Sequence, residues 1–211
     1  RLSVGDKLGA GDAIVFLAAS GIHANGLSLA RKLAERLPQG YLTDIGNGQT
    51  YGEALLAPTT LYSPVTEALA KEGIFPHYCA NVTGHGWRKL LRHPKQLTYR
   101  ITAVPPKTAI LAFMQQECGL DDHEAYGTLN MGAGFALFVS AADAERTAAV
   151  AMVLAWVAST GLHDADQRLG PQAIIMAIDV ALFLVLLAVA LKSDRWWPMW
   201  AAAFHGLSVV L

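Results

Sequence analysis

GDAIVFLAASGIHANG, residues 11–26, is the stretch that decides the predicted fold. Its apolar and β-branched residues over 13–19 predict a buried strand, and the glycine-bounded loop after them carries His23 and Asn25. An amphipathic helix is predicted over 27–37, and Asn25 is a favourable N-cap for it. The loop is either a tight turn between strand and helix or a binding site for an anion such as phosphate. The free N–H groups of a first helical turn attract such anions.

The composition narrows the class of protein. The 211 residues suffice for one ordinary domain with a hydrophobic core. The formal net charge of −1 argues against sequence-independent binding of nucleic acid. Cys79 and Cys118 lie far apart without ligand-type neighbours, so neither a zinc site nor a disulfide framework is predicted, and we expect a cytoplasmic setting. The chain opens at Arg1 without an initiator methionine, which predicts a fragment that lacks an upstream part.

A second polar loop, TGHG over 83–86, follows a short predicted strand and precedes a predicted helix. The loop offers a hydroxyl, flexible backbone N–H groups and an imidazole, with Arg88 and Lys89 close behind. It is a second candidate anion site, unless these cations form an ordinary solvated helix face.

A third glycine-bearing loop lies before the strand predicted over 135–139. The residues DDHE over 121–124 could suggest a metal site, but consecutive side chains point in different directions, whereas metal ligands must converge. The better interpretation is that Asp122 caps a helix with Glu124 in its first turn, and no metal ligand is assigned.

The last part of the chain is much more apolar. Residues 172–191 contain Asp179 as their only charge, are long enough to cross a bilayer as a helix, and precede the cationic and Trp residues typical of a lipid–water interface. Residues 198–211 predict a truncated second helix. The alternative is a buried core helix in a soluble protein, which Asp179 favours because an ionisable group in lipid is costly. The orientation of a span stays open, because the cations after it would place the preceding domain outside unless 148–162 also crosses.

Three stretches match motifs of one known family in the same order. Residues 19–31 (ASGIHANGLSLAR) resemble SSGxHSNGxSLxR, residues 53–62 (EALLAPTTLY) resemble ELLxPTRIY, and residues 124–134 (EAYGTLNMGAG) resemble EMYRTFNMGxG. These motifs are those of aminoimidazole ribonucleotide synthase, the phosphoribosylformylglycinamidine cyclo-ligase of purine biosynthesis. The resemblance covers 6–139 and corresponds to the C-terminal domain of that family.

The chain departs from these motifs at three positions. His85 interrupts the usual TGGG, Gly127 replaces an arginine, and Ala24 replaces a serine. A bulky imidazole thus stands where close backbone approach is normal, and the expected pocket loses one cation and one hydroxyl. These differences predict a divergent member and leave the exact substrate open.

The resemblance implies a fold for the whole chain. The family domain would cover 1–171 as an α+β fold, a mixed sheet covered by helices, followed by the hydrophobic and membrane-like tail over 172–211. An alignment with the family that reaches about Met176 would place a helix over 143–150 and strands over 155–158 and 170–175.

The resemblance also implies a function. In the family's reaction, ATP phosphorylates the formamide oxygen of formylglycinamidine ribonucleotide, and an amidine nitrogen then closes the imidazole ring. This chain would be the C-terminal, substrate-binding half of such an enzyme, a homodimer in its full form. It would be inactive without the N-terminal half, which holds ATP and Mg²⁺. His23 would be the catalytic group. The ribonucleotide would be bound by these residues: Ser20, Gly21, Asn25, Gly26, Thr83, Gly84, His85, Gly86, Asn130 and Gly132.

Other functions fit the sequence as well. Relatives of this architecture phosphorylate thiamine monophosphate or form selenophosphate, so an ATP-dependent small-molecule kinase is the enzymatic alternative. The non-enzymatic alternative is a module that holds a nucleotide without chemistry and is tethered to a membrane by 172–211. The tail could also come from an unrelated protein joined to this domain.

Overall fold

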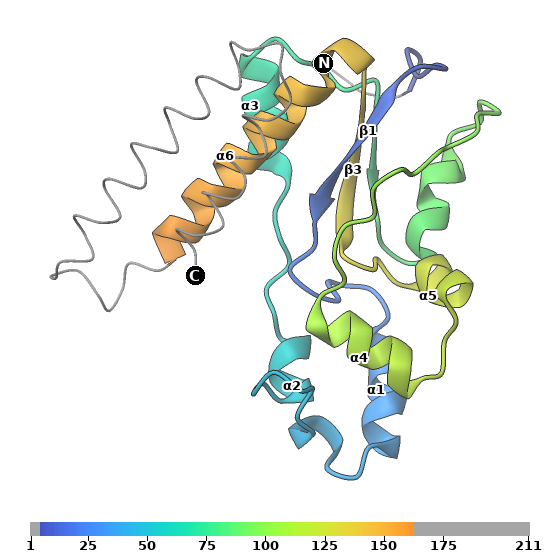
Figure 1. The fold of residues 1–211 in the computed structure, drawn as a ribbon, viewed down its shortest axis with the longest axis vertical. Helices are drawn as coiled ribbons and strands as arrows, with labels where there is room; N and C mark the ends of the chain where they lie inside the picture. The colour runs from blue at the N-terminus through green and yellow to red at the C-terminus, as the bar shows by residue number, and fades with distance from the viewer. Residues whose placement is uncertain (1–4, 163–211) are drawn as a thin grey trace, which may run out of the picture.

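The computed structural model describes residues 5–162, and its centre is a three-stranded sheet (Figure 1). β1 (Ala13–Ala18) and β2 (Tyr78–Asn81) both pair with β3 (Ala133–Val139), so the strand order is β1-β3-β2. Both pairings are antiparallel. The predicted α+β class is confirmed. The prediction of a mixed sheet is wrong for the described residues, because β1 and β2 run in the same direction but β3 lies between them, so no two parallel strands pair.

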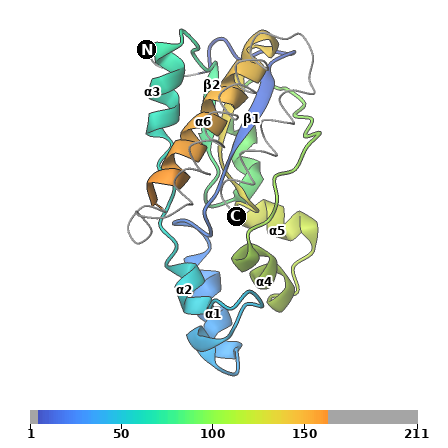
Figure 2. The same ribbon diagram turned by 60° about the vertical axis from the view of Figure 1, so that its left-hand side comes forward.

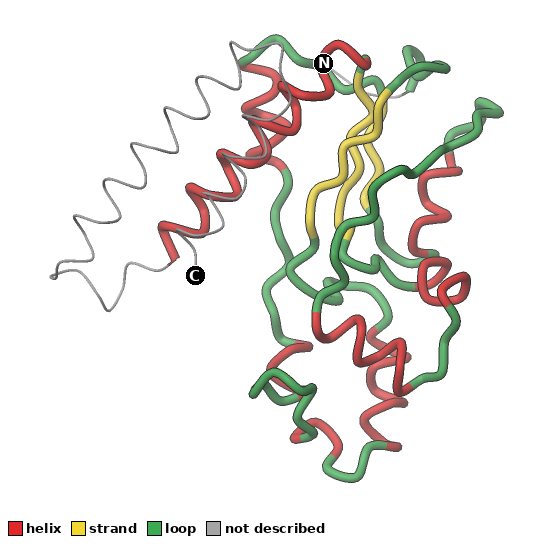
Figure 3. Tube along the Cα trace, viewed as in Figure 1, coloured by secondary structure: helices red, strands yellow, loops and turns green. Residues whose placement is uncertain are grey.

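Side chains of β3 alternate between the two faces of the sheet. Ala136 and Phe138 belong to one face, where Leu90 of η2 (Gly86–Arg92) and alternate residues of the extended segment 97–101 cover them. This segment follows η2 and runs along the sheet as a loop (Figure 3). The helix that the sequence predicts after the second polar loop is present, as the 3-10 helix η2.

Leu137 and Val139 belong to the opposite face, which α3 (Ser63–Lys71) and α6 (Ala144–Leu162) cover. Figures 1 and 2 both show these two helices side by side. Pro64 lies in the first turn of α3, where its missing N–H costs no helical hydrogen bond.

A second, helical core lies beyond one end of the sheet (Figure 1). Tyr51 is fully buried there and donates its hydroxyl to the backbone oxygen of Ala30 at 3.1 Å, which joins two of the helices. The helices of this core are α1 (Leu27–Arg36), α2 (Tyr51–Leu55), α4 (Ala109–Glu117) and α5 (Asp122–Thr128). The short turns η1 (Gly40–Leu42) and η3 (Ala141–Asp143) complete the described elements.

The cap of α5 lies one residue earlier than predicted. The Asp121 side chain accepts from Glu124 N at 2.7 Å, and the Glu124 carboxylate accepts from Asp121 N at 3.3 Å, which makes a capping box. Asp122 is the first helical residue instead. Glu124 lies in the first turn, as expected.

The length of α6 overturns one further prediction. The strand predicted over 155–158 is wrong, because these residues continue α6, in which Val150 and Leu154 recur at helical spacing beside α3. Residues 148–162 also lie within α6, and no helix of the described chain combines the length and apolar character that a membrane crossing requires. The predictions for three ranges lie outside the described residues: 170–175, 172–191 and 198–211.

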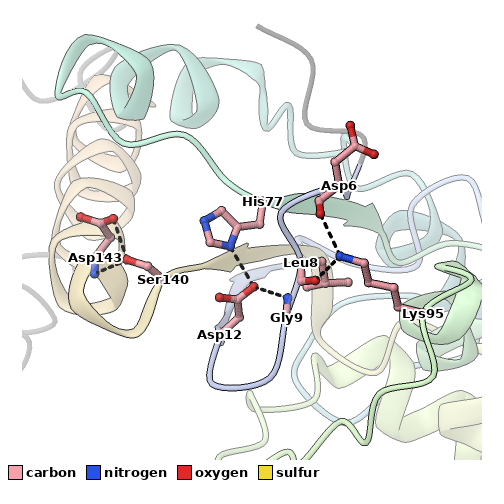
Figure 4. A network of polar contacts seen from close by, with 8 residues as sticks. All are labelled: Asp6, Leu8, Gly9, Asp12, His77, Lys95, Ser140 and Asp143. Atoms are coloured by element: carbon pink, nitrogen blue, oxygen red, sulfur yellow. Dashed lines mark hydrogen bonds and ion pairs between the residues drawn. The ribbon is translucent and has the colours of Figure 1, made fainter.

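A polar network closes the sheet at the end where β1 begins (Figure 4). Asp12 Oδ2 accepts hydrogen bonds from Gly9 N at 3.0 Å and from His77 Nδ1 at 2.8 Å. Lys95 Nζ donates to the backbone oxygens of two neighbouring residues, Asp6 at 2.8 Å and Leu8 at 2.7 Å. These bonds fix the turn before β1 against the start of β2.

We expect Asp12→Ala to lower the free energy of unfolding by about 1–3 kcal/mol, because it leaves the N–H of Gly9 and the ring of His77 without their acceptor. Equilibrium unfolding in urea measures this loss. Asp6→Ala is the control, since Lys95 bonds the backbone oxygen of Asp6 and not its carboxylate, and its effect should stay within about 0.5 kcal/mol. Equal losses in the two variants would contradict the role of Asp12.

Candidate functional site

Three loops that lie far apart in the sequence meet at one end of the sheet. The first loop (19–26) follows β1, the second loop (82–86) follows β2, and the third loop (128–132) precedes β3. Because β3 runs antiparallel to both neighbours, its beginning lies beside the ends of β1 and β2. The topology thus gathers the three polar loops at the junction between the sheet and the helical core (Figure 3).

His23 is fixed inside the first loop. It is 7% exposed, and its Nε2 lies 3.1 Å from the backbone N of Ser20 and 3.0 Å from Ser20 Oγ. The Ser20 hydroxyl itself donates to the backbone oxygen of Pro58 at 2.5 Å. Because a backbone N–H can only donate, Nε2 is the accepting nitrogen, and the neutral ring carries its proton on Nδ1. The neutral ring therefore has its one N–H donor at Nδ1.

Burial lowers the pKa of His23 below its ordinary value of 6.5, because desolvation penalises the charged imidazolium. The unfolded chain therefore binds a proton on this ring at a higher pH than the folded chain does. The associated stability is complete above about pH 6.5 and is lost as pH falls through the lowered pKa.

Urea unfolding at about pH 7.5 and 5.0 tests this linkage, because removal of the ring should weaken the pH dependence. We expect a smaller fall in the free energy of unfolding for His23→Gln than for the wild type. His123→Gln, at an exposed position, should keep the wild-type fall. If His23→Gln kept it too, the ring would not be buried in its neutral form.

Asn25 does not cap α1, contrary to the prediction. The N-cap is Gly26, whose φ of 76° is left-handed, and no side chain caps this helix. The Asn25 side chain is turned to the third loop, where Nδ2 donates to the backbone oxygen of Thr128 at 3.1 Å. The local cap is lost because Gly26 makes the turn into the helix and Asn25 is used for a tertiary hydrogen bond.

Asn130 ties the third loop to the first. Its side chain is fully buried, and Nδ2 donates to the backbone oxygens of Gly21 at 2.9 Å and Ile22 at 3.3 Å. Its Oδ1 accepts from Gly132 N at 3.0 Å, which shapes the third loop itself. The amide is thus satisfied at both ends and sets the spacing between the two loops.

The second loop packs on the third through Gly86. Its φ is 51°, and a Cβ at this position would overlap the backbone oxygen of Tyr126 and lie 2.6 Å from that of Leu129. Trp87 Nε1 adds a hydrogen bond of 2.8 Å to the backbone oxygen of Asn130. Only a glycine permits this approach of two backbones.

The other predicted site residues lie in the same place. Gly84 approaches the first loop, since a Cβ on it would lie 3.6 Å from Asn25 Oδ1. Thr83 Oγ1 accepts a hydrogen bond from Lys89 Nζ at 2.8 Å, so a cationic ammonium group lies beside this hydroxyl. The side chain of His85 is exposed to solvent. Gly132 packs closely on the chain before α4, since a Cβ on it would overlap the backbone oxygen of Pro106.

Each loop holds one non-glycine residue in the left-handed region of backbone space. These residues are His23 (φ 56°), His85 (φ 74°) and Met131 (φ 46°), and within residues 5–162 no other non-glycine residue has a positive φ. Such conformations cost of order 1–3 kcal/mol each and concentrate at functional sites. Their gathering at one end of the sheet marks this end as the candidate site.

Comparison with known proteins identifies the family of this chain. Residues 9–158 match the family of AIR synthase related proteins in its C-terminal domain. The chain belongs to this family. The phosphoribosylformylglycinamidine cyclo-ligase of Methanococcus maripaludis is 39% identical over 144 residues, which are 67% of this chain and 41% of that relative. The enzymes of the same name from Methanocaldococcus jannaschii and Lachnospira eligens are 38% and 32% identical and cover 72% and 68% of the chain.

The chain spans less than half the length of these curated relatives, since it covers 41%, 44% and 43% of them. Membership of the AIR synthase related family confirms the resemblance seen in the sequence. The roles of single residues stay predictions.

The three loops do not fit a Mg²⁺ ion. They contain no carboxylate, and within the part of the chain that the structure describes no three His, Cys, Asp or Glu side chains come together as a metal site. Mg²⁺ is usually held by carboxylates and substrate phosphates. Hydroxyl, amide, imidazole and backbone N–H groups, which the loops do contain, suit the oxygens of an organic phosphate.

The sequence reasoning missed two residues that support His23. Tyr62 Oη donates to the backbone oxygen of Ala18 at 2.7 Å, and burial raises the pKa of Tyr62 to about 12, which keeps this donor protonated. A Cβ at Gly134 would overlap Tyr62 Oη and lie 2.9 Å from His23 Cε1. Both residues end family-like stretches, 53–62 and 124–134, and that position was the available signal.

The candidate site does not coincide with the cavity near the start of β1. A cavity of about 620 Å³ lies elsewhere on the described chain, lined by the turn before β1 and by residues 96–103. No residue of the three loops lines it.

Proposed function

We propose that this chain forms the C-terminal wall of the substrate cleft of an ATP-dependent cyclo-ligase. The reaction would convert formylglycinamidine ribonucleotide to aminoimidazole ribonucleotide in purine biosynthesis. The observation that carries the proposal is the convergence of the three family-like loops, tied by Asn130 and Asn25 into one surface. The relatives are phosphoribosylformylglycinamidine cyclo-ligases, which supports this reaction over that of the small-molecule kinases.

In this proposal the chain binds and orients the ribonucleotide. Thr83, with Lys89 beside it, and the backbone N–H groups of the loops would hold phosphate oxygens. His23 would donate its Nδ1–H to the reacting formamide group, whose oxygen accepts a phosphoryl group from ATP before the amidine nitrogen displaces phosphate and closes the ring. ATP and Mg²⁺ would be held by the N-terminal half, because the three loops carry no carboxylate.

A chimera tests the proposal directly. The full chain is joined to the N-terminal half of the Methanococcus maripaludis relative, and formation of aminoimidazole ribonucleotide from formylglycinamidine ribonucleotide and ATP is followed. We expect product from the chimera and none from either half alone. A folded chimera that binds ATP but forms no product would overturn the proposal.

His23→Ala in this chimera should lower kcat/KM by about 10²- to 10⁴-fold, because the imidazole is the proposed donor to the reacting group. His123→Ala is the control, since this histidine is exposed and lies outside the three loops. Unchanged turnover in His23→Ala would remove His23 from the mechanism.

The setting of the full protein also stays a proposal. We infer a homodimer in the cytoplasm that binds a small ribonucleotide and no nucleic acid. Sedimentation of the chimera should give twice its monomer mass, and a monomeric active chimera would contradict the dimer. Residues 172–211 lie outside the described residues, so contact of this tail with a membrane stays a prediction.

A further inference from the structure

Arg88 lies directly over Gly127, the position where the family motif has an arginine. A Cβ on Gly127 would lie 2.9, 3.0 and 3.1 Å from Arg88 Nη2, Cζ and Nε. These nearly equal distances show that the plane of the guanidinium covers the glycine. A side chain at 127 and the present position of Arg88 therefore exclude each other.

This guanidinium lies at the contact between η2, which carries Arg88, and α5, which carries Gly127. Gly86 packs against the backbone on both sides of Gly127, because a Cβ on it would overlap the oxygen of Tyr126 and lie 3.0 Å from Thr128 N. Trp87 adds to the same contact. The centroid of its ring lies 4.9 Å from that of the Tyr126 ring, and the two rings are arranged edge to face. Arg88 thus extends from this contact, close in sequence to the second loop.

The charge of Arg88 is not neutralised by the surrounding chain. Within residues 5–162 no acidic group lies at ion-pair distance from it, and the side chain is exposed. Two neighbouring lysines already have partners. Lys89 donates to Thr83, and Lys107 pairs with Asp122 at 3.1 Å.

We propose that Arg88 is a specificity-determining residue that binds the phosphate group of the ribonucleotide and supplies the cation that Gly127 has lost. A guanidinium can offer two parallel N–H donors to a phosphate, and its exposed edge is free to do so. The glycine is then the matching change, because it makes the room in which Arg88 lies. This inference rests on the proposed function of the three loops.

Calorimetry of the full chain with ribose 5-phosphate as the probe, and ribose as its uncharged counterpart, tests the inference without any turnover. We expect Arg88→Met to weaken ribose 5-phosphate binding by about 10- to 100-fold and to leave ribose unaffected. Arg88→Lys should recover only part of the loss. Arg92→Met, which removes an exposed cation from the same 3-10 helix, should change affinity less than about threefold.

The exchange of positions gives the sharper result. Arg88→Ala combined with Gly127→Arg should restore affinity to within about threefold of the wild type, whereas Gly127→Arg alone should not improve it, because Arg88 already fills the space. Wild-type affinity in Arg88→Met, or no binding of ribose 5-phosphate by the wild type, would overturn the inference. An active chimera whose Arg88→Met variant keeps its KM would overturn the inference alone, while loss of phosphate binding in Arg88→Met with an inactive chimera would overturn only the cyclo-ligase function.

Discussion

Gly86→Ala should lower the free energy of unfolding by about 3–5 kcal/mol. The added Cβ would overlap the backbone oxygen of Tyr126 and come within 2.6 Å of that of Leu129, and neither atom can move without displacing α5 or the third loop. The left-handed φ of 51° adds its own cost for an L side chain. Urea unfolding followed by tryptophan fluorescence measures the loss, since Trp87 lies next to the change.

Gly119→Ala separates the two causes. This glycine has a similar φ of 63° but would place its Cβ in open space, so we expect a loss of about 1 kcal/mol from backbone strain alone. If both variants lost the same stability, the second and third loops would not be in the contact that the structure gives them.

Asn130→Asp should lower the free energy of unfolding by about 3–5 kcal/mol at neutral pH. The introduced carboxylate keeps the size of the amide but faces the backbone oxygens of Gly21 and Ile22, which can only accept, and it is shielded from water. Burial raises the pKa of such a carboxyl group, so the penalty is present above the unfolded value near 4 and disappears as pH falls below it.

The pH dependence is the decisive readout for this variant. The difference between wild type and Asn130→Asp should shrink between pH 7 and pH 4, because a protonated carboxyl group can again donate one hydrogen bond. Asn47→Asp, at an exposed position, should stay within about 0.5 kcal/mol throughout. A pH-independent loss in Asn130→Asp would show that the buried amide does not face the two oxygens.

Local structure was largely predictable from the sequence. The strand at 13–18, the helix from residue 27 and the strand ending at Val139 follow from hydrophobic periodicity and from glycine positions, which act over a few residues. The motifs placed His23 and the loop glycines in one family-like site, and the structure brings those loops together.

The long-range features could not be read in the same way. The prediction of a mixed sheet is wrong because strand order depends on which strand lies between the other two. No local sequence pattern indicates this order. Asn25 has all the properties of a cap, yet its partner Thr128 lies 103 residues away. The position of Arg88 over Gly127 likewise appears only when η2 and α5 are brought together.

Hydrogen–deuterium exchange of the full chain, with and without saturating formylglycinamidine ribonucleotide, tests the central claim that the three loops form one substrate wall. We expect peptides that cover 19–26, 82–86 and 128–132 to gain protection together, while the cavity-lining segment 96–103 stays unchanged. Protection confined to 96–103, or to only one of the three loops, would contradict the account.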